Sequence, residues 1–215
     1  MSLTRLKSEL AEMGVEIDIV YVEEKNAHQI SITKDSPAQV MDGKIYVLSD
    51  LSNEERIQAE AHELGHLYVK ELGIINFEPI YNEPIGYLKL ELNNTLSHKF
   101  IIQILEEKFG ISSDIHLQLR IRGIDSTKNY LIDSDMDTEV LYGLGLNLYD
   151  IAITAPNSKN DVLEVLSLNE SIKRAYQAAE THLGSIHLGM SKEEQEQVVN
   201  EFLSELGITI DYLIN

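Results

Sequence analysis

The segment from Ser52 to Gly73 constrains the fold more strongly than any other part of the chain, because it combines a helix start, an apolar stripe and a helix stop. Ser52, with Glu55 three positions later, has the form of a capping box, which closes the first turn of a helix. Gly73 is the residue type that most often ends one. Between them, apolar residues recur at helical spacing, namely Ile57, Ala61, Leu64 and Tyr68. We therefore expect a helix over residues 53–72 with one buried face.

This helix carries the sequence His62-Glu63-Leu64-Gly65-His66. Residues four apart lie on one face of a helix, so the two imidazoles can bind a single Zn²⁺ at about 2.0–2.1 Å. Glu63 is placed to accept a proton from an attacking water, whose pKa a bound zinc ion lowers to about 7. The spacing therefore predicts one zinc ion per chain, held by His62 and His66, with Glu63 as the general base.

The residues around this motif are small or apolar, which favours a largely buried helix over a solvent-facing one. They are Ala59, Ala61, Leu64, Gly65, Leu67 and Val69. Two histidines without partners in such surroundings would be costly, which supports the metal interpretation over a pair of surface histidines. Gly65 within a helix costs about 1 kcal/mol relative to alanine, so we expect close backbone packing at this position.

A third protein ligand must come from outside the motif. The chain has no cysteine, so the ligand must be a histidine or a carboxylate. The metzincin arrangement needs a glycine and a histidine at positions that Val69 and Leu72 occupy, which excludes it. Glu71 lies on the same predicted helix but points away from the metal-binding face.

The next predicted helix, over residues 86–109, offers a better third ligand. Glu91 is the best placed carboxylate, and His98 lies on the same helical face as its main rival. His98 could instead support another ligand, donate a hydrogen bond to the reacting group, or simply pack in the core. Glu78 and Glu83, in the preceding loop, are weaker alternatives.

The rest of the chain predicts an α+β fold. The N-terminal elements we expect are a helix that stops at Gly14, strands over residues 15–22, 29–33 and 44–48, and a hairpin turn at Asp42-Gly43. Residues 116–122 alternate like a strand but also suit a helix. Further helices are expected over residues 130–155, 161–183 and 192–206, with a polar break at 157–160 and a capping box at Ser191 and Glu194.

These elements predict a zincin-like metallopeptidase domain, with a small sheet and an active-site helix, over residues 1–125. A mainly helical C-terminal region would follow over residues 126–215, either separate or packed with the first domain as one unit. No apolar run approaches the roughly 20 residues that a membrane-spanning helix needs, so we expect no membrane association. The absence of cysteine fits a reducing cytoplasm, and a cytoplasmic location is expected.

The net charge of −19, from 36 acidic and 17 basic residues, argues against direct binding of nucleic acid. Binding to DNA or RNA depends on basic side chains that neutralise phosphates, and this chain has a strong excess of acid. The charge suits a basic protein partner, although it also serves solubility alone.

Residues 44–48, followed by residues 55–67, resemble the ImmA/IrrE family of zinc metallopeptidases. In that family a strand leads into a helix with a His-Glu-Leu-Gly-His type motif, and a later helix opens with a Glu-Ala-Asn type motif. Glu91-Leu92-Asn93 is similar to this second element, which implies that Glu91 is the third zinc ligand. Leu92 stands where the family has a small residue, and the resemblance covers residues 15–110.

The resemblance implies hydrolysis of a peptide bond in a regulatory protein, such as a basic, DNA-binding transcriptional repressor. The alternative is a degenerate, metal-stabilised module that binds a protein partner without hydrolysis. Glu63 favours the enzyme, because a purely structural zinc site needs no carboxylate beside its ligand.

Overall fold

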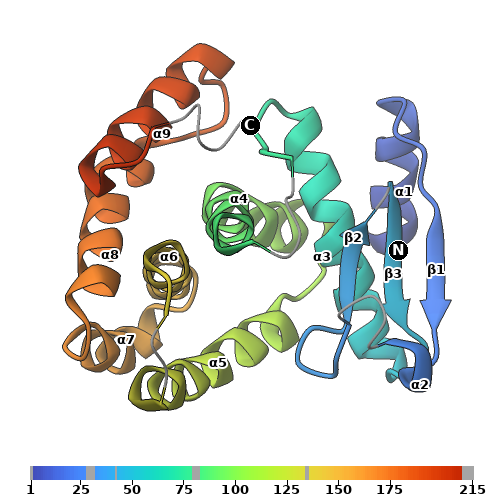
Figure 1. The fold of residues 1–215 in the computed structure, drawn as a ribbon. Coiled ribbons are helices and arrows are strands. Elements are labelled where there is room, and N and C mark those ends of the chain that lie inside the picture. The colour runs from blue at the N-terminus through green and yellow to red at the C-terminus, as the bar shows by residue number, and fades with distance from the viewer. Residues whose placement is uncertain (1, 28–31, 42, 79–82, 134–135, 210–215) are drawn as a thin grey trace. The chain divides into compact units, whose positions relative to one another are not determined.

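A computed structural model describes residues 2–27, 32–41, 43–78, 83–133 and 136–209 (Figure 1). The chain divides into two compact units, each built from two stretches of sequence. The first unit combines Met1–Glu71 with Phe100–Leu119, and the second combines Leu72–Lys99 with Arg120–Asn215. The predicted boundary between residues 125 and 126 stays a prediction. The predicted α+β class is confirmed, because the described residues are mostly helical and include a small three-stranded sheet, whereas the zincin-like fold stays a prediction.

The sheet belongs to the first unit and has three short strands, in the order β1-β3-β2 (Figure 1). They are β1 (Ile19–Val22), β2 (Ala38–Met41) and β3 (Lys44–Leu48). β1 runs parallel to β3, and β2 pairs with β3 as an antiparallel hairpin. The predicted turn at Asp42-Gly43 is confirmed by this pairing, although Asp42 itself lies outside the described residues. Gly43 has a φ of +73°, a backbone conformation that glycine adopts at little cost.

Two strand predictions need correction. The strand expected over residues 15–22 is shorter, since only Ile19–Val22 pairs with β3. Of the strand expected over residues 29–33, residues 29–31 lie outside the described part, and Ile32 and Thr33 belong to no strand. Ile32 is buried against Ala27 and Leu48, so its apolar character reflects a small loop core rather than a sheet face. The third strand is β2 instead. A short helix, α2 (Glu24–Ala27), was not predicted.

The motif helix forms where the sequence predicts it, as α3 (Asn53–Glu71). Its capping box is confirmed, because the backbone N–H of Ser52 donates to the Glu55 carboxylate at 2.8 Å and Glu55 N–H donates to Ser52 Oγ at 3.3 Å. α3 contacts strands β2 and β3 and also the N-terminal helix α1 (Ser2–Glu12). The sheet and α1 together therefore fix the position of the motif.

Glu60 ties α3 to its neighbours within the first unit. Its buried carboxylate accepts a hydrogen bond from Lys7 Nζ of α1 at 2.8 Å and another from Tyr21 Oη of β1 at 2.6 Å. Each carboxylate oxygen has one of these partners, so the burial of the charge is compensated. Glu60 therefore holds both α1 and β1 against the motif helix.

α4 (Pro84–Gln103) continues as a π-helical turn over Ile104–Phe109 and stops at Gly110, which has a φ of +62°. The helix predicted over residues 86–109 is thus confirmed, with its last turn wider than an α-helix. In the first unit, Ile101 packs against Gly65 of α3, where an added Cβ would lie 2.6 Å from Ile101 Cγ2. Close packing at Gly65 is confirmed, although the closest atom belongs to a side chain rather than to backbone.

Residues 116–122, whose sequence suited either a strand or a helix, are helical and belong to α5 (Asp114–Asp133). Its first turn is attached to α3, because the Gln58 side-chain oxygen accepts the backbone N–H of Ile115 at 3.0 Å. The Ser112 hydroxyl accepts the N–H of Asp114 at 3.0 Å. These two bonds satisfy helix-terminal donors that have no partner inside the helix.

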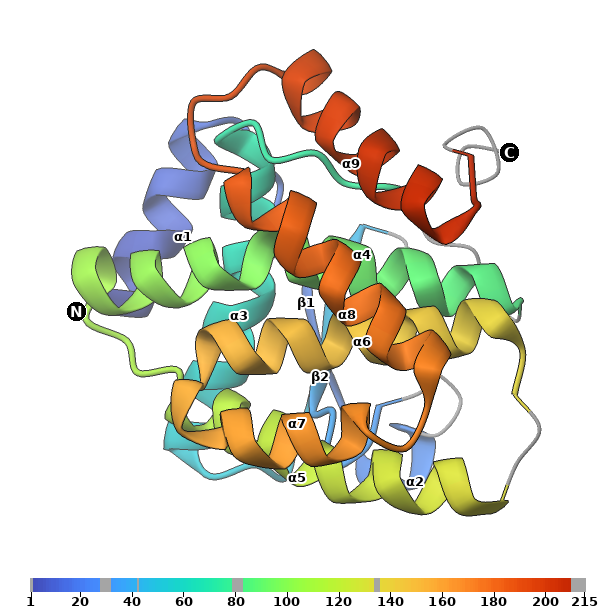
Figure 2. The same ribbon diagram turned by 90° about the vertical axis from the view of Figure 1, so that its left-hand side faces the viewer.

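The second unit contains the remaining helices (Figure 2). They are α6 (Thr138–Thr154), α7 (Lys159–Leu166), α8 (Glu170–His182) and α9 (Lys192–Leu206). The single helix predicted over residues 161–183 is wrong, because Asn169 caps a new helix and separates α7 from α8. The capping box of α9 is confirmed. Within the part of the chain that the structure describes, no helix has both the length and the apolar character required to cross a membrane.

Replacing Gly65 with alanine should lower the free energy of unfolding. Overpacking a buried position costs about 1–3 kcal/mol, more than the roughly 1 kcal/mol that alanine gains over glycine in a helix. Gly123→Ala on α5 is the matched control, since no described atom lies within 4 Å of a Cβ there. It should raise the unfolding free energy by about 0.5–1 kcal/mol. Urea unfolding followed by circular dichroism measures both, and a stabilised Gly65→Ala protein would contradict the packing.

Glu60→Gln should also destabilise the protein, because it removes the charge that Lys7 pairs with and replaces one acceptor oxygen by an amide donor. Loss of a charge-assisted hydrogen bond costs about 1.5–3 kcal/mol, and the partial exposure of Lys7 favours the lower end. Glu54→Gln, an exposed change on the same helix, should alter the unfolding free energy by less than about 0.5 kcal/mol. Equal stabilities of the two variants in urea unfolding would count against the anchoring role of Glu60.

Candidate metal centre

The motif histidines of α3 have the geometry of two ligands of one metal ion. His62 Nε2 and His66 Nε2 lie 3.2 Å apart, and the ring centroids are 4.9 Å apart with an interplanar angle of 86°. Two nitrogens at about 2.0–2.1 Å from a tetrahedral zinc ion are ~3.3–3.4 Å apart, with ring centroids ~5 Å apart. Both distances agree with this expectation, so the donor pair fits zinc.

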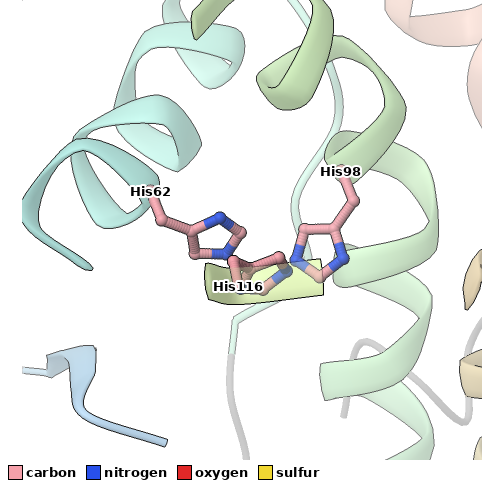
Figure 3. A group of neighbouring side chains, drawn as sticks. All are labelled: His62, His98 and His116. Atoms are coloured by element: carbon pink, nitrogen blue, oxygen red, sulfur yellow. The ribbon is translucent and has the colours of Figure 1, made fainter. Parts of the chain in front are cut away.

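His116, in the first turn of α5, stacks on His62. The ring centroids are 3.7 Å apart and the planes differ by 21°, a face-to-face contact (Figure 3). This separation is shorter than the ~5 Å expected for two imidazoles on the same tetrahedral ion. In this arrangement His116 therefore orients the ring of His62. Gln58 of α3 accepts the N–H of Ile115, so the motif helix itself positions the turn that carries His116.

Glu63, which follows His62 directly in the motif, is half-buried. Burial raises the pKa of its carboxyl to about 7, and a hydrogen bond from the backbone N–H of Val40 on β2 opposes this rise. A carboxyl with a pKa near neutral pH is suited to accept and release a proton. The burial of Glu63 therefore favours the neutral form of its carboxyl more than water does.

His98 belongs to the second unit, where it lies on α4 and is fully buried. Its Nδ1 lies 2.6 Å from Asp150 Oδ2 of α6, and Arg120 Nη2 donates to the same carboxylate oxygen at 2.7 Å. Burial, assisted by the nearby positive charge of Arg120, holds the pKa of His98 well below its usual value. The imidazole is therefore neutral near neutral pH, which is the form that binds metals.

Glu91 is also buried in the second unit, seven residues before His98 on α4. Its Oε2 accepts hydrogen bonds from Asn147 Nδ2 at 3.0 Å and from Asn94 Nδ2 at 3.5 Å, and Arg120 Nη2 lies 3.9 Å away. Burial raises the pKa of Glu91, while Arg120 and the two amides lower it. The glutamate thus sits in a polar network within an otherwise apolar group of helices.

The structure brings His62, Glu63 and His66 together within one unit, as the sequence predicts, and places Glu91 and His98 in the other. Glu71 is exposed at the end of α3, in agreement with its exclusion as a ligand. Of the three histidines drawn in Figure 3, His62 and His116 belong to the first unit and His98 belongs to the second. The choice between Glu91 and His98 as the third ligand stays a prediction.

Sequence reasoning missed His116 and Asp150, as well as Arg120 and Asn147. His116 and Arg120 lie in a segment whose alternation fitted a strand as well as a helix, so their positions could not be assigned. A signal for the other two was present, because Asn147 and Asp150 are the only polar residues in the apolar stretch 146–153. Three residues apart on a helix, they share one face, and buried polar side chains on one face indicate a polar network.

Comparison of the chain with family models, with curated proteins and with solved structures finds no match. The resemblance to the ImmA/IrrE family is therefore carried by residues 44–48, 55–67 and 91–93 alone. Any function assigned to the site therefore rests on the geometry of its residues rather than on similarity to a known protein.

Proposed function

We propose that this protein is a zinc-dependent metallopeptidase that hydrolyses a peptide bond in a protein substrate. One observation carries the proposal, namely the 3.2 Å separation of His62 Nε2 and His66 Nε2 beside the half-buried carboxylate of Glu63. A purely structural metal site would need the two histidines but not the acid. A metallopeptidase needs both, because its base must act next to the metal.

Different side chains have different roles in the proposed reaction. His62 and His66 bind the metal, and His116 holds the ring of His62 in the orientation that this requires. The third ligand is Glu91 or His98. Zinc, when bound, supplies a Lewis acid that polarises the scissile carbonyl and makes water a stronger acid.

Glu63 holds and moves the proton. Its carboxylate accepts a proton from the attacking water, and the resulting acid then donates it to the nitrogen of the leaving amine. The backbone N–H of Val40 on β2 lowers the pKa of this carboxyl and so favours the charged form that accepts the proton. Partial burial excludes bulk water that would compete for the proton.

The acidity of the chain supports a basic substrate. A net charge of −19 attracts a positively charged protein and repels free nucleic acid. A basic, DNA-binding repressor, which the family resemblance implies, has this property. We therefore place the proposed substrate among basic regulatory proteins.

Metal binding tests the first part of the proposal. The purified protein should bind one zinc ion per chain in native mass spectrometry, and His62→Ala and His66→Ala should each abolish stoichiometric binding. His187→Ala, which removes an exposed histidine, is the matched control and should bind zinc like the wild type. A folded wild-type protein that takes up no zinc would rule the proposal out.

Hydrolysis tests the second part. Glu63→Gln should keep the fold and the zinc but lose cleavage by about 10²–10⁴-fold, because an amide cannot accept the water proton. Glu71→Gln, at the exposed end of the same helix, should cleave at the wild-type rate. The measurement is mass spectrometry of fragments after incubation with a basic repressor protein and with a diverse peptide mixture.

Equal cleavage by wild type and Glu63→Gln would remove Glu63 as the base. A zinc-loaded protein that binds a basic partner tightly and leaves it intact, with the same affinity in the Glu63→Gln variant, would instead identify a binding module.

A further inference from the structure

Residues 73–78 belong to the second unit and form no helix or strand. Gln195 of α9, which is almost completely buried, holds the first half of this segment. Its amide oxygen accepts the backbone N–H of Ile75 at 3.1 Å, and its amide nitrogen donates to the carbonyl oxygen of Gly73 at 2.7 Å. The same nitrogen donates to the carbonyl oxygen of Met190 at 3.1 Å, so the amide has one fixed orientation.

Asn93 of α4 holds the second half of the segment in the same way. Its amide oxygen accepts the backbone N–H of Phe77 at 2.8 Å, and its amide nitrogen donates to the carbonyl oxygen of Phe77 at 2.8 Å. One side chain thus makes the pair of bonds that a residue of a neighbouring β-strand would make. The residues held are Gly73, Ile75 and Phe77, and hydrogen bonds to one side from alternate residues are characteristic of an extended chain.

The opposite edge of the segment carries the backbone groups of Ile74 and Asn76. Successive residues of an extended chain direct their N–H and C=O groups to opposite sides, so these two residues face away from the amides of Asn93 and Gln195. No residue that the structure describes makes a hydrogen bond to the backbone of either one. Asn76 is exposed. An extended edge without a partner is a template for the pairing of another extended chain.

The occupant that fits this edge is an extended, basic peptide segment. A polypeptide backbone repeats its donors and acceptors every second residue, about 6.6–6.8 Å apart, as the edge does. The side chain of Glu78 is exposed at the end of the segment, and the whole chain has a net charge of −19. A positively charged segment is therefore attracted, whereas a second copy of this acidic chain is repelled.

We propose that residues 73–78 are a docking strand for an extended, basic segment of a protein partner, which pairs with the backbone of Ile74 and Asn76. Recognition of this kind takes its affinity from main-chain hydrogen bonds. Gln195 and Asn93 keep the strand extended before the partner binds, which reduces the entropy lost on binding. The docking strand lies within the second unit and is independent of the metal centre, because a peptidase and a binding module could both use it.

Amide hydrogen exchange of the full-length protein, measured by NMR, tests the docking strand residue by residue. The probe is an acetylated and amidated octapeptide of alternating lysine and valine. Without the peptide, the N–H groups of Ile75 and Phe77 should exchange slowly and that of Asn76 rapidly. With the octapeptide bound, the N–H of Asn76 should exchange at least about 10-fold more slowly, because it then donates to the peptide.

A matched control peptide has the same sequence and charge but carries a methyl group on every backbone nitrogen, so it cannot pair as a strand. It should leave the exchange of Asn76 unchanged. Equal protection by both peptides would show attraction of charge alone and would overturn the proposal. So would unchanged exchange of Asn76, with or without measurable binding of the octapeptide. Protection that grows with protein concentration in the absence of peptide would mean that a second copy fills the edge, which also overturns it.

Two substitutions of one residue separate the backbone from the side chain. Asn76→Pro removes the N–H that the partner would use and leaves the observed hydrogen bonds of the segment in place. The Kd of the octapeptide, measured by calorimetry, should rise about 2–10-fold, which corresponds to one backbone hydrogen bond. Asn76→Ala keeps the N–H and should bind like the wild type.

A folded Asn76→Pro protein with wild-type affinity would contradict the backbone pairing. If proline disturbs the segment, the N–H groups of Ile75 and Phe77 lose their protection, and the exchange of Asn76 in the unmodified protein then decides the proposal alone.

Discussion

The contact between two imidazole nitrogens, 3.2 Å apart on one buried helix, is the constraint on which the first unit depends. A helix that carries polar rings into apolar surroundings needs firm anchors on its other faces. α3 has them in the charged hydrogen bonds of Glu60 to Lys7 and Tyr21, and in the close packing of Gly65 against Ile101. The small sheet and α1 thus hold the helix that carries the histidine pair.

The parts of this structure that sequence reasoning could predict are those governed by local chemistry. The capping box at Ser52, the turn at Gly43 and the stop at Gly110 each depend on a few neighbouring residues, and each forms as expected. The motif helix could be predicted because its capping box, the spacing of its apolar residues and its terminal glycine all indicate the same segment. When local signals agree in this way, a single sequence is enough to predict whether a segment forms a helix or a strand.

The parts that could not be predicted depend on residues far apart in the chain. Ile32 has the alternating neighbours of a strand, but it is buried in a loop core with Ala27 and Leu48. The stacking of His116 on His62 joins positions that no local pattern connects. The same holds for Asp150 and His98, whose contact arises only when two separate helices pack together.

The pairing of β2 has a consequence for the edge of the sheet. The N–H of Ile45 donates to Asp18 on the β1 side, so its partner Val40 directs its own N–H away from β3. The same backbone group lowers the pKa of Glu63. Because β2 is an edge strand of the described sheet, an extended peptide that paired with it in register with Val40 would meet this N–H near the motif glutamate.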